Sequence, residues 1–363
     1  MAINALNWVY NDPFHFIFVC ATTGTSFLSN GLLLFIIFTT PATQLGSYRT
    51  LLAIFAVCDI STSFMHAVLQ PVMYLTSSGF YCLPRHAPLM LFGVSLDTPL
   101  LLMFVAAYYQ TFLIIAYHFV YRYKAVTKML SNSCTDKWKT RHWIIIGVFF
   151  YVVFVGAFLF CSSLELIPSD FTRSNAPSEI LKIYGKDVTD KNIGFTRKCS
   201  ANTTELCWHW PSLISVCGPM CLFAGTAAVI CYCIYGTWTI IKSTSTGLTE
   251  TTREMQQKLF NALLIQTVIP FVFSYIPLTI VILFPIFTGI ELGGLGNFLF
   301  SITAIFPAID SFFVLYFIVP FRHAIIRISR LPFKNKISDM SSFEEMNSIT
   351  VTVHKSSRVE VQT

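Results

Sequence analysis

The sequence predicts an all-α protein whose helices cross a membrane seven times as a bundle. Hydrophobic residues make up 54% of the chain, charged residues only 12%, and the mean hydropathy is +0.64. Soluble domains carry about 25% charged residues, so this chain lacks the polar side chains that cover a globule in water. Its apolar residues also gather in stretches of about 20, the length of helix that spans the hydrocarbon core.

Seven such stretches follow one another along the chain. The predicted spans are 14–38, 50–73, 94–119, 142–165, 211–236, 259–285 and 295–319. We expect residues 1–333 to form one domain and the Ser- and Thr-rich segment 334–363 to be a disordered cytoplasmic tail. The first span has no basic region or small-residue cleavage site before it, which indicates an uncleaved anchor.

The distribution of Lys and Arg predicts the orientation. Of the 24 such residues, 17 lie in the alternate connections that include 118–141 and the C-terminal segment. Six of the other seven lie in the long segment 166–209, which crosses a membrane largely regardless of charge. The N-terminus is therefore predicted outside and the C-terminus in the cytoplasm. The sequon at Asn202 then lies on the glycosylated side.

Three polar residues are predicted to lie at one depth inside the spans. Asn30, Asp59 and Asp310 each stand about eight or nine residues from the cytoplasmic end of their span, or roughly 12–14 Å into the bilayer. An ionisable group in a bilayer costs several kcal/mol unless it is paired or hydrated. Three interpretations stay open: a hydrated cluster that binds protons or a sodium ion at Asp59, a purely structural contact, and a coincidence of depth.

Prolines predict bends in the last two spans. Pro270 and Pro277 lie seven residues apart on one face of span six, and Pro307 precedes Asp310 by three residues. Each removes a backbone hydrogen bond, so the cytoplasmic end of span six is expected to swing. After span seven, the spacing of residues 320–331 would place apolar side chains on one face of a helix and basic side chains on the other. This pattern predicts a short amphipathic helix on the membrane surface.

Span three is predicted to end at Tyr121-Arg122-Tyr123. Arg122 either extends to the lipid headgroups or is held against neighbouring helices and released to meet a partner. The residues alone do not choose between these two roles.

Several sequence blocks match a known family in order and spacing. They are Leu45-Gly46-Ser47-Tyr48-Arg49, Gln70-Pro71, His118-Phe119-Val120-Tyr121-Arg122-Tyr123, Gln256–Ala262, Gln266-Thr267-Val268-Ile269-Pro270, Tyr275-Ile276-Pro277, Pro307-Ala308-Ile309-Asp310 and Pro320-Phe321-Arg322. Over roughly residues 45–330 the chain resembles the nematode seven-transmembrane chemoreceptors of the str/srj type, a group that includes odorant receptors. The resemblance implies a G-protein-coupled receptor of rhodopsin-like architecture that detects an odour or another small-molecule cue and signals to a heterotrimeric G protein. It also implies the plasma membrane of sensory-neuron cilia as the location.

The resemblance carries over to a few residues. Tyr121-Arg122-Tyr123 resembles the D/E-R-Y motif of rhodopsin-like receptors, but the acidic residue is absent, so an Arg–carboxylate contact is not implied. Asp310-Ser311 stands where the family usually has Asp-Pro, and Pro307 is expected to supply the bend instead. Asp59 resembles the sodium-site Asp of rhodopsin-like receptors.

Receptors of this architecture bind small molecules among the outer halves of their helices. The candidate lining residues are His66, Gln70, Met103, Phe104, Tyr108, Phe273 and Tyr275. A lining so rich in Phe, Met and Tyr suits a small, mostly apolar ligand with one or two polar groups. For each of these side chains, ordinary packing between helices is the alternative.

The outer cysteines are expected to form one bridge, because that side of the membrane is oxidising. Cys82 would pair with Cys199 or Cys207, and the third cysteine would stay free or join another, such as Cys161. The 11 cysteines have no paired CxxC spacing, so no zinc site is indicated.

Other functional classes fit less well. A seven-span ligand-gated cation channel is the alternative function, but it has its N-terminus inside. A transporter would need broken midplane helices, usually in repeats, and an intramembrane enzyme would need a catalytic constellation that the spans lack. We therefore expect no enzymatic activity, cofactor or nucleic-acid partner.

Overall fold

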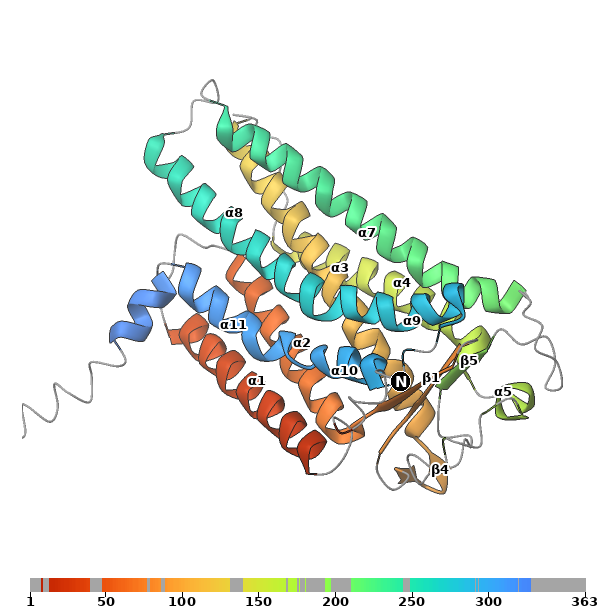
Figure 1. The fold of residues 1–363 in the computed structure, drawn as a ribbon. Coiled ribbons are helices and arrows are strands. Elements are labelled where there is room, and N and C mark those ends of the chain that lie inside the picture. Colours follow the sequence, from red (N-terminus) through yellow and green to blue (C-terminus); the bar gives the residue numbers. More distant parts are fainter. Residues whose placement is uncertain are drawn as a thin grey trace, which may run out of the picture.

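Seven long apolar helices dominate the structure, a computed structural model (Figure 1). The structure describes residues 8, 13–39, 48–76, 79–85, 89–130, 140–167, 169–174, 176, 180, 193–196, 210–243, 249–290, 292, 294–318 and 320–327. Each helix has the length and composition needed to cross a membrane, so the predicted all-α bundle of seven spans is confirmed. The predicted tail 334–363 and the sequon at Asn202 lie outside the described residues.

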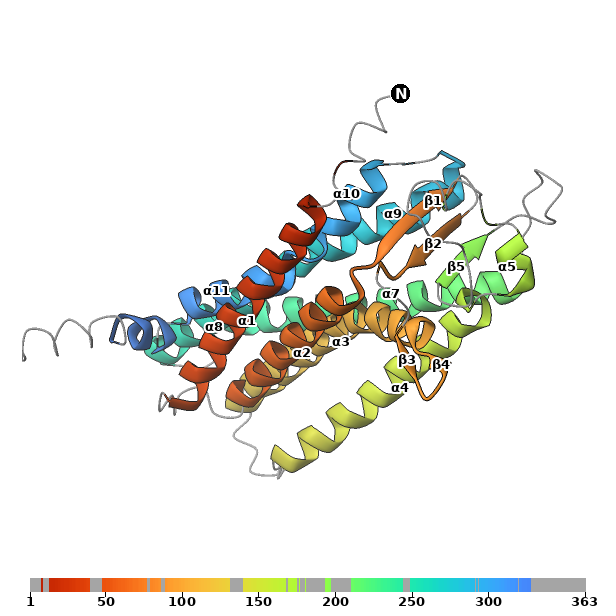
Figure 2. The same cartoon turned by 90° about the horizontal axis from the view of Figure 1, so that it is seen from below.

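The first five spans are α1 (Phe14–Thr39), α2 (Tyr48–Leu69), α3 (Asp97–Leu130), α4 (Thr140–Leu166) and α7 (Trp210–Lys242). Helix α3 runs through the middle of the bundle, packs against α2, α4, α7 and α8, and is among the most buried spans (Figures 1 and 2). Helix α4 is the least buried and exposes a broad apolar face. The apolar residues on its outside therefore face lipid.

The sixth span is built from three segments. Helix α8 (Glu250–Pro270) passes into a π-helical turn, η4 (Phe271–Tyr275), and then into α9 (Ile276–Thr288). The Ile276 amide donates to the Phe271 carbonyl five residues back, instead of four. Pro277, in the first turn of α9, has no amide hydrogen to give, and π-turns of this kind often mark functional sites.

The seventh span is also interrupted. Helix α10 (Gly294–Ile302) is separated by a turn from α11 (Phe306–Phe317). Pro307 lies in the first turn of α11, where its missing N–H costs no hydrogen bond. A short helix follows over residues 320–327, with Phe321 buried and Arg322, His323 and Arg327 exposed, as the amphipathic pattern predicts.

A small antiparallel sheet covers one end of the bundle, which we call the sheet end. It consists of β1 (Val72–Thr76), β2 (Gly79–Leu83) and β5 (Ile193–Thr196) in the order β1-β2-β5, and it lies across the ends of α9 and α10 (Figures 1 and 2). Successive side chains of a strand point to opposite faces. Phe80 and Cys82 accordingly join the bundle core, whereas Tyr81 and Leu83 pack in a separate cluster with Val72.

The sheet corrects two sequence-based predictions. Span two was expected to continue to residue 73, but α2 ends at Leu69, and Gln70, with φ of 40°, turns the chain into β1. The predicted bridge from Cys82 is also wrong, because Cys82 is a free, buried cysteine that faces the bundle. Cys161 is free as well, and Cys199 and Cys207 lie outside the described residues.

Burial suppresses the reactivity of that thiol. Cys82 lies among apolar side chains, and this desolvation raises the pKa of its thiol to about 12. The thiol is therefore protonated at neutral pH and a poor nucleophile.

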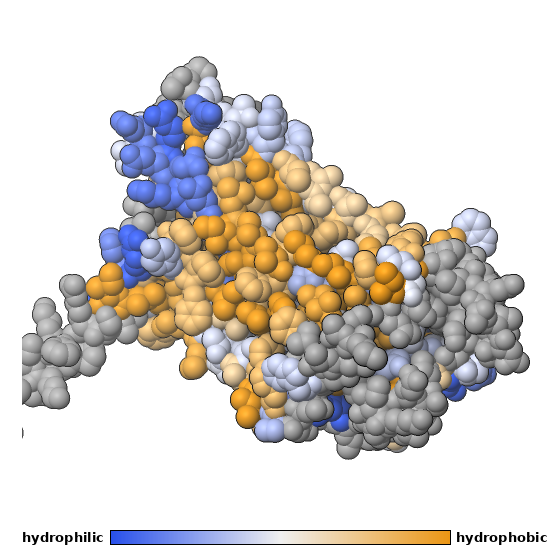
Figure 3. Space-filling model, viewed as in Figure 1, coloured by the Kyte–Doolittle hydropathy of each residue, from blue (hydrophilic) through white to orange (hydrophobic). Residues whose placement is uncertain are grey.

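The surface of the bundle is mostly apolar. Figure 3 shows a continuous hydrophobic surface over the helices and a hydrophilic patch where α8 begins, at the end opposite the sheet. We call this the loop end. Such a distribution fits a band of lipid around the bundle with water at its ends.

Close contact between α4 and α7 depends on one glycine. A Cβ atom added at Gly218 would lie 2.7 Å from the sulfur of Cys161, closer than real Cβ contacts, whereas nothing lies within 4 Å of a Cβ at Gly225 on the same helix. We predict that Gly218→Ala lowers the unfolding free energy by about 1–3 kcal/mol through overpacking. Gly225→Ala should be neutral or stabilising by up to about 1 kcal/mol, because alanine favours a helix. Thermal unfolding of the two purified variants in detergent measures this, and equal stability would show that α4 and α7 do not pack this closely.

Candidate ligand cavity and the contacts between spans

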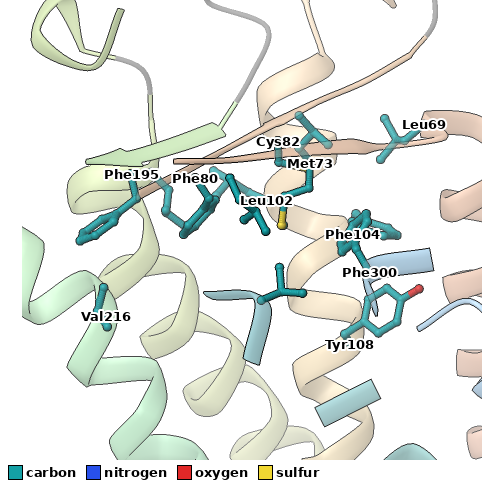
Figure 4. Close-up of a cluster of buried hydrophobic side chains, with 14 of the residues drawn as sticks. Leu69, Met73, Phe80, Cys82, Leu102, Phe104, Tyr108, Phe195, Val216 and Phe300 are labelled. Carbon is teal, nitrogen blue, oxygen red and sulfur yellow. The ribbon is translucent and has the colours of Figure 1, made fainter. Parts of the chain in front are cut away.

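A cavity of about 60 Å³ lies just below the sheet, between α3, α4, α7, α9 and α10. Its lining is mainly aromatic and aliphatic, and side chains of β2 close it from the sheet end. Figure 4 shows Phe80 and Cys82 from the sheet, Phe104 and Tyr108 from α3, and Phe300 from α10 gathered around this region. A volume of this size is about twice that of one water molecule in the liquid.

One polar group in the lining has no partner. Ser162 of α4 is 1% exposed, and its hydroxyl makes no hydrogen bond within the described part of the chain. A buried hydroxyl without a partner costs roughly 1–3 kcal/mol. The cavity therefore offers one unsatisfied hydrogen-bonding group within an apolar lining.

Tyr108 connects the cavity to three other helices. Its hydroxyl lies 2.9 Å from Nδ1 of His66 on α2, and its carbonyl accepts a hydrogen bond of 3.4 Å from the Tyr275 hydroxyl in η4. Its ring packs edge-on against Phe306 of α11. A shift of Tyr108 would thus change contacts with the second, sixth and seventh spans together.

The seven candidate lining residues occupy different places. Phe104 and Tyr108 line the cavity, and His66 and Tyr275 stand behind Tyr108 as its hydrogen-bond partners. Phe273 packs against the same apolar cluster without reaching the cavity.

Met103 and Gln70 do not line the cavity. Met103 is 53% exposed, because it lies one residue, or about 100° of helix rotation, from Phe104. Gln70 stands at the turn between α2 and β1.

Residues that were not among the predicted lining also contribute to the cavity. Met73, Phe80 and Cys82 come from the β1–β2 hairpin, where the end of a span and a loop were predicted, and Ser162 comes from α4. The turn-forming Ser77-Ser78-Gly79 between two short apolar runs was the available signal for this hairpin.

A polar cluster lies deeper in the bundle and joins α1, α2, α8 and α11. The Asn30 side chain donates to the Pro307 carbonyl at 2.9 Å and accepts from the Ser311 hydroxyl. Gln266 of α8 donates to Asp310 at 3.3 Å. Asn30 and Asp310 therefore each bond to a neighbouring helix.

Asp59 lies close enough to Asp310 to interact with it electrostatically, yet its carboxylate is unpaired. Both oxygens of Asp59 and Oδ1 of Asp310 are buried without a hydrogen-bond partner in the described part of the chain. A cation or a shared proton would satisfy these oxygens. Among the described residues, however, no group of three His, Cys, Asp or Glu side chains could hold a metal ion.

Near the loop end, three consecutive residues of α3 contact three different sets of helices. Tyr121 packs its ring on Trp143 of α4, and Tyr123 packs on Tyr232 of α7. Arg122, between them, points toward α8 and α2. Because successive residues of a helix are about 100° apart, this triplet touches most of the surrounding bundle.

Arg122 is buried and bound to a neutral partner. Its Nη2 donates to Oε1 of Gln256 on α8 at 2.6 Å, and its guanidinium lies 5.5 Å from the ring centre of Tyr48 on α2. We call this set the α3–α8 contact. An amide and an aromatic face hold the charge where a carboxylate is absent, by a charge-assisted hydrogen bond and a cation–π interaction.

The position of the triplet within α3 differs from the prediction. The predicted span reaches residue 119, with Tyr121-Arg122-Tyr123 at its cytoplasmic end, but helix α3 continues to Leu130, so Arg122 lies about two turns before the end of the helix. Helix α3 therefore contacts α8 at Arg122, about two turns before α3 ends.

Comparison with known proteins decides the family. A sequence model of the serpentine type 7TM GPCR chemoreceptor Str matches residues 15–326. The chain belongs to this family. The Str assignment agrees with the resemblance seen in the sequence blocks, and it identifies a multi-pass membrane receptor.

Relatives of this Str-family chain are nematode receptors. It is 24% identical over 314 residues to serpentine receptor class r-10 of Caenorhabditis briggsae, covering 86% of this chain and 89% of that one. It is 21% identical over 307 residues to G-protein coupled receptor str-33 of Caenorhabditis elegans, covering 84% and 87%. It is also 25% identical over 305 residues to serpentine receptor class J-38 of Caenorhabditis elegans, covering 82% and 87%.

Among solved structures, squid rhodopsin has the same fold. The two chains superpose with a TM-score of 0.50 over 90% of this chain and 85% of rhodopsin, at 12% identity. The rhodopsin-like architecture that the sequence predicts is thus confirmed at the level of the fold.

The Asn30 contacts give the Str-family bundle a measurable link between α1 and α11. We predict that Asn30→Ala lowers the unfolding free energy by about 1–3 kcal/mol, because it leaves a buried carbonyl and a buried hydroxyl without their partner. Asn261→Ala is the matched control, since Asn261 is exposed and its side chain accepts a hydrogen bond from Gln257 on its own helix. Thermal unfolding in detergent compares them, and an unchanged stability for Asn30→Ala would remove this cluster from the account.

Proposed function

We propose that this Str-family receptor binds a small-molecule cue in the cavity under the sheet and signals to a heterotrimeric G protein at the loop end. In this proposal the sheet end faces the outside, as the Lys and Arg distribution predicts. The receptor then resides in the plasma membrane of sensory-neuron cilia and serves olfaction or a related chemical sense.

The observation that carries the proposal is the connection from the cavity to the sixth span. Tyr108 lines the cavity and bonds to Tyr275, which lies in the π-turn of that span. At its loop end the same span is held to α3 through Gln256 and Arg122. A ligand that moves Tyr108 would act on the π-turn in the middle of the sixth span, and the Arg122–Gln256 bond is one of the contacts that restrain the loop end of that span.

The cavity supports a particular kind of ligand. Its lining is apolar except for a few hydroxyl groups, of which that of Ser162 is unpaired. This lining suits a molecule with few non-hydrogen atoms, mostly hydrocarbon and with one hydrogen-bonding group.

The α3–α8 contact predicts opposite effects for two variants of Gln256. Gln256→Ala removes a hydrogen bond to a charged group worth about 1.5–3 kcal/mol, so ligand-free signalling should rise about tenfold or more. Gln256→Glu places a carboxylate beside Arg122 and should lower it, because charge-assisted pairs are stronger. Gln257→Ala, which loses a bond within its own helix, is the control. Basal cyclic-nucleotide and calcium signals in transfected cells measure this, and equal basal signals in all three would contradict the restraint.

Arg122 itself is expected to be needed for coupling. Arg122→Ala should reach the cell surface in normal amounts and lose the ligand response, because the side chain that the partner would meet is gone. The measurement is surface labelling together with a response to a panel of small volatile molecules. Full signalling by this variant would remove Arg122 from the coupling role.

Ser162 is expected to select ligands that carry an oxygen. Ser162→Ala should raise the concentration for half-maximal response to an alcohol or carbonyl ligand about 3- to 10-fold, the value of one hydrogen bond of about 0.5–1.5 kcal/mol. The neighbouring Ser163→Ala is the control, since Ser163 is half-buried, does not line the cavity and bonds to the Phe160 carbonyl on its own helix. Dose–response curves of both variants measure this, and equal half-maximal concentrations for the two variants would place the ligand elsewhere.

The ligand-gated cation channel remains testable in the same cells. A channel would give a ligand-evoked current when G-protein signalling is blocked, whereas the proposed receptor gives none. An N-terminal tag exposed on the cytosolic face would also favour the channel.

A further inference from the structure

The most exposed aromatic side chain among the described residues lies at the tip of a tight hairpin. Strands β3 (Met90–Leu91) and β4 (Val94–Ser95) pair through Leu91 and Val94, with Phe92 and Gly93 as the two-residue loop. Phe92 is 98% exposed, and Met90, Leu91 and Val94 are each more than half exposed. Five consecutive residues without a polar side chain thus project from the protein.

Turn geometry does not account for the phenylalanine. Phe92 has φ of 49° and Gly93 has φ of 82°, the pattern of a type I′ turn. Asn or Gly at the first of these positions would adopt it readily, whereas a bulky side chain in the left-handed region is strained. An aromatic ring here is unfavourable for the backbone and unfavourable in water.

The hairpin is fixed at its base, so its tip does not fold back onto the protein. Asp97, the buried first residue of α3, accepts hydrogen bonds from the Leu89 amide at 3.1 Å and the Ser95 hydroxyl at 3.4 Å. The Leu96 amide also donates to the Leu89 carbonyl at 2.9 Å. These bonds direct the tip away from the bundle.

The hairpin stands at the side of the bundle, not over its end. In Figures 1 and 2 it lies at the periphery beside the start of α3, whereas the β1-β2-β5 sheet covers the helix ends. On α3 the next exposed residues are Pro99 and Met103, four residues apart and hence on one face. The apolar tip is therefore continuous with an exposed apolar face of a membrane-spanning helix.

We propose that the β3–β4 hairpin inserts its tip into the lipid–water interface of the bilayer and that membrane lipid is its partner. Aromatic and aliphatic side chains are favoured at that depth, and the removal of Phe92 from water offsets its strained backbone. A protein partner would be expected to meet a polar rim around an apolar centre, and residues 89–96 carry no charged side chain.

Insertion would hold the sheet end of α3 at a fixed depth. Asp97 ties the hairpin to the first turn of the helix that carries Phe104 and Tyr108. The inserted tip therefore anchors one wall of the cavity to the membrane. This inference rests on the membrane-spanning fold and not on the proposed signalling function.

Tryptophan fluorescence of the full chain in lipid nanodiscs tests the proposal. Phe92→Trp places the probe at the tip, and Asp170→Trp is the matched control, because the Asp170 side chain is fully exposed on α5 (Asp170–Ser174), beyond the end of α4. The emission of the parent chain is subtracted from each variant. Nanodiscs of ordinary phosphatidylcholine are compared with nanodiscs whose lipid carries bromine near the headgroup end of its acyl chains.

The added Phe92→Trp emission should lie to the blue of the Asp170→Trp emission, be largely lost in brominated lipid and resist quenching by acrylamide in the water. Val94→Trp, on the same tip, should behave alike and covers a folding failure at position 92. Emission that matches the control and is quenched by acrylamide would place the tip in water, as a surface for a soluble partner. Blue-shifted emission that bromine leaves unchanged would mean that the tip packs against protein, and it would equally overturn the proposal.

Discussion

A polar group inside a bilayer cannot hydrogen-bond to water, and this constraint governs how the seven helices hold together. Apolar side chains gain little from leaving lipid for one another, so contacts between spans depend on close packing and on hydrogen bonds. The structure places such bonds at three levels: His66 with Tyr108 near the cavity, Asn30 with α11 in the middle, and Arg122 with Gln256 near the loop end.

Of these three levels, the one near the loop end holds the sixth span, which is the element that moves in the proposed function. Its backbone is irregular at η4, it receives one hydrogen bond from the cavity side, and its loop end is held by a neutral amide. A neutral acceptor holds a guanidinium less tightly than a carboxylate does. In the proposed function this restraint defines the resting position of the sixth span, and ligand binding overcomes it.

The sequence predicted the spans well because lipid exposure makes hydropathy a direct signal. All seven predicted spans correspond to helices. The main error is in Val72–Leu83, which was predicted as the end of span two and a loop but contains strands β1 and β2. That run is as apolar as a helix because one strand face packs on the bundle and the other on its own small cluster. Apolar composition alone does not separate a buried strand from the end of a span.

Site residues were harder to predict than spans, for reasons that differ by residue. Phe104 and Met103 are adjacent and equally apolar, and only the rotation of α3 decides which one faces the cavity. Gln256 and Tyr48 were visible in the sequence blocks that resemble the family, but their meeting at Arg122 joins three helices far apart in the chain. Ser162 gave no local signal, because the sequence does not show that its hydroxyl is buried without a hydrogen-bond partner in the described part of the chain.

The most direct test of the central claim is the distance between α3 and α8 at the loop end. Spectroscopic labels at the exposed positions Lys128 and Glu254 report it in the full-length receptor in nanodiscs. We expect one narrow distance distribution for the parent chain and a second, longer population when Gln256 is replaced by alanine. The same single distribution in both proteins would contradict it, because the sixth span would then be held by something other than Arg122.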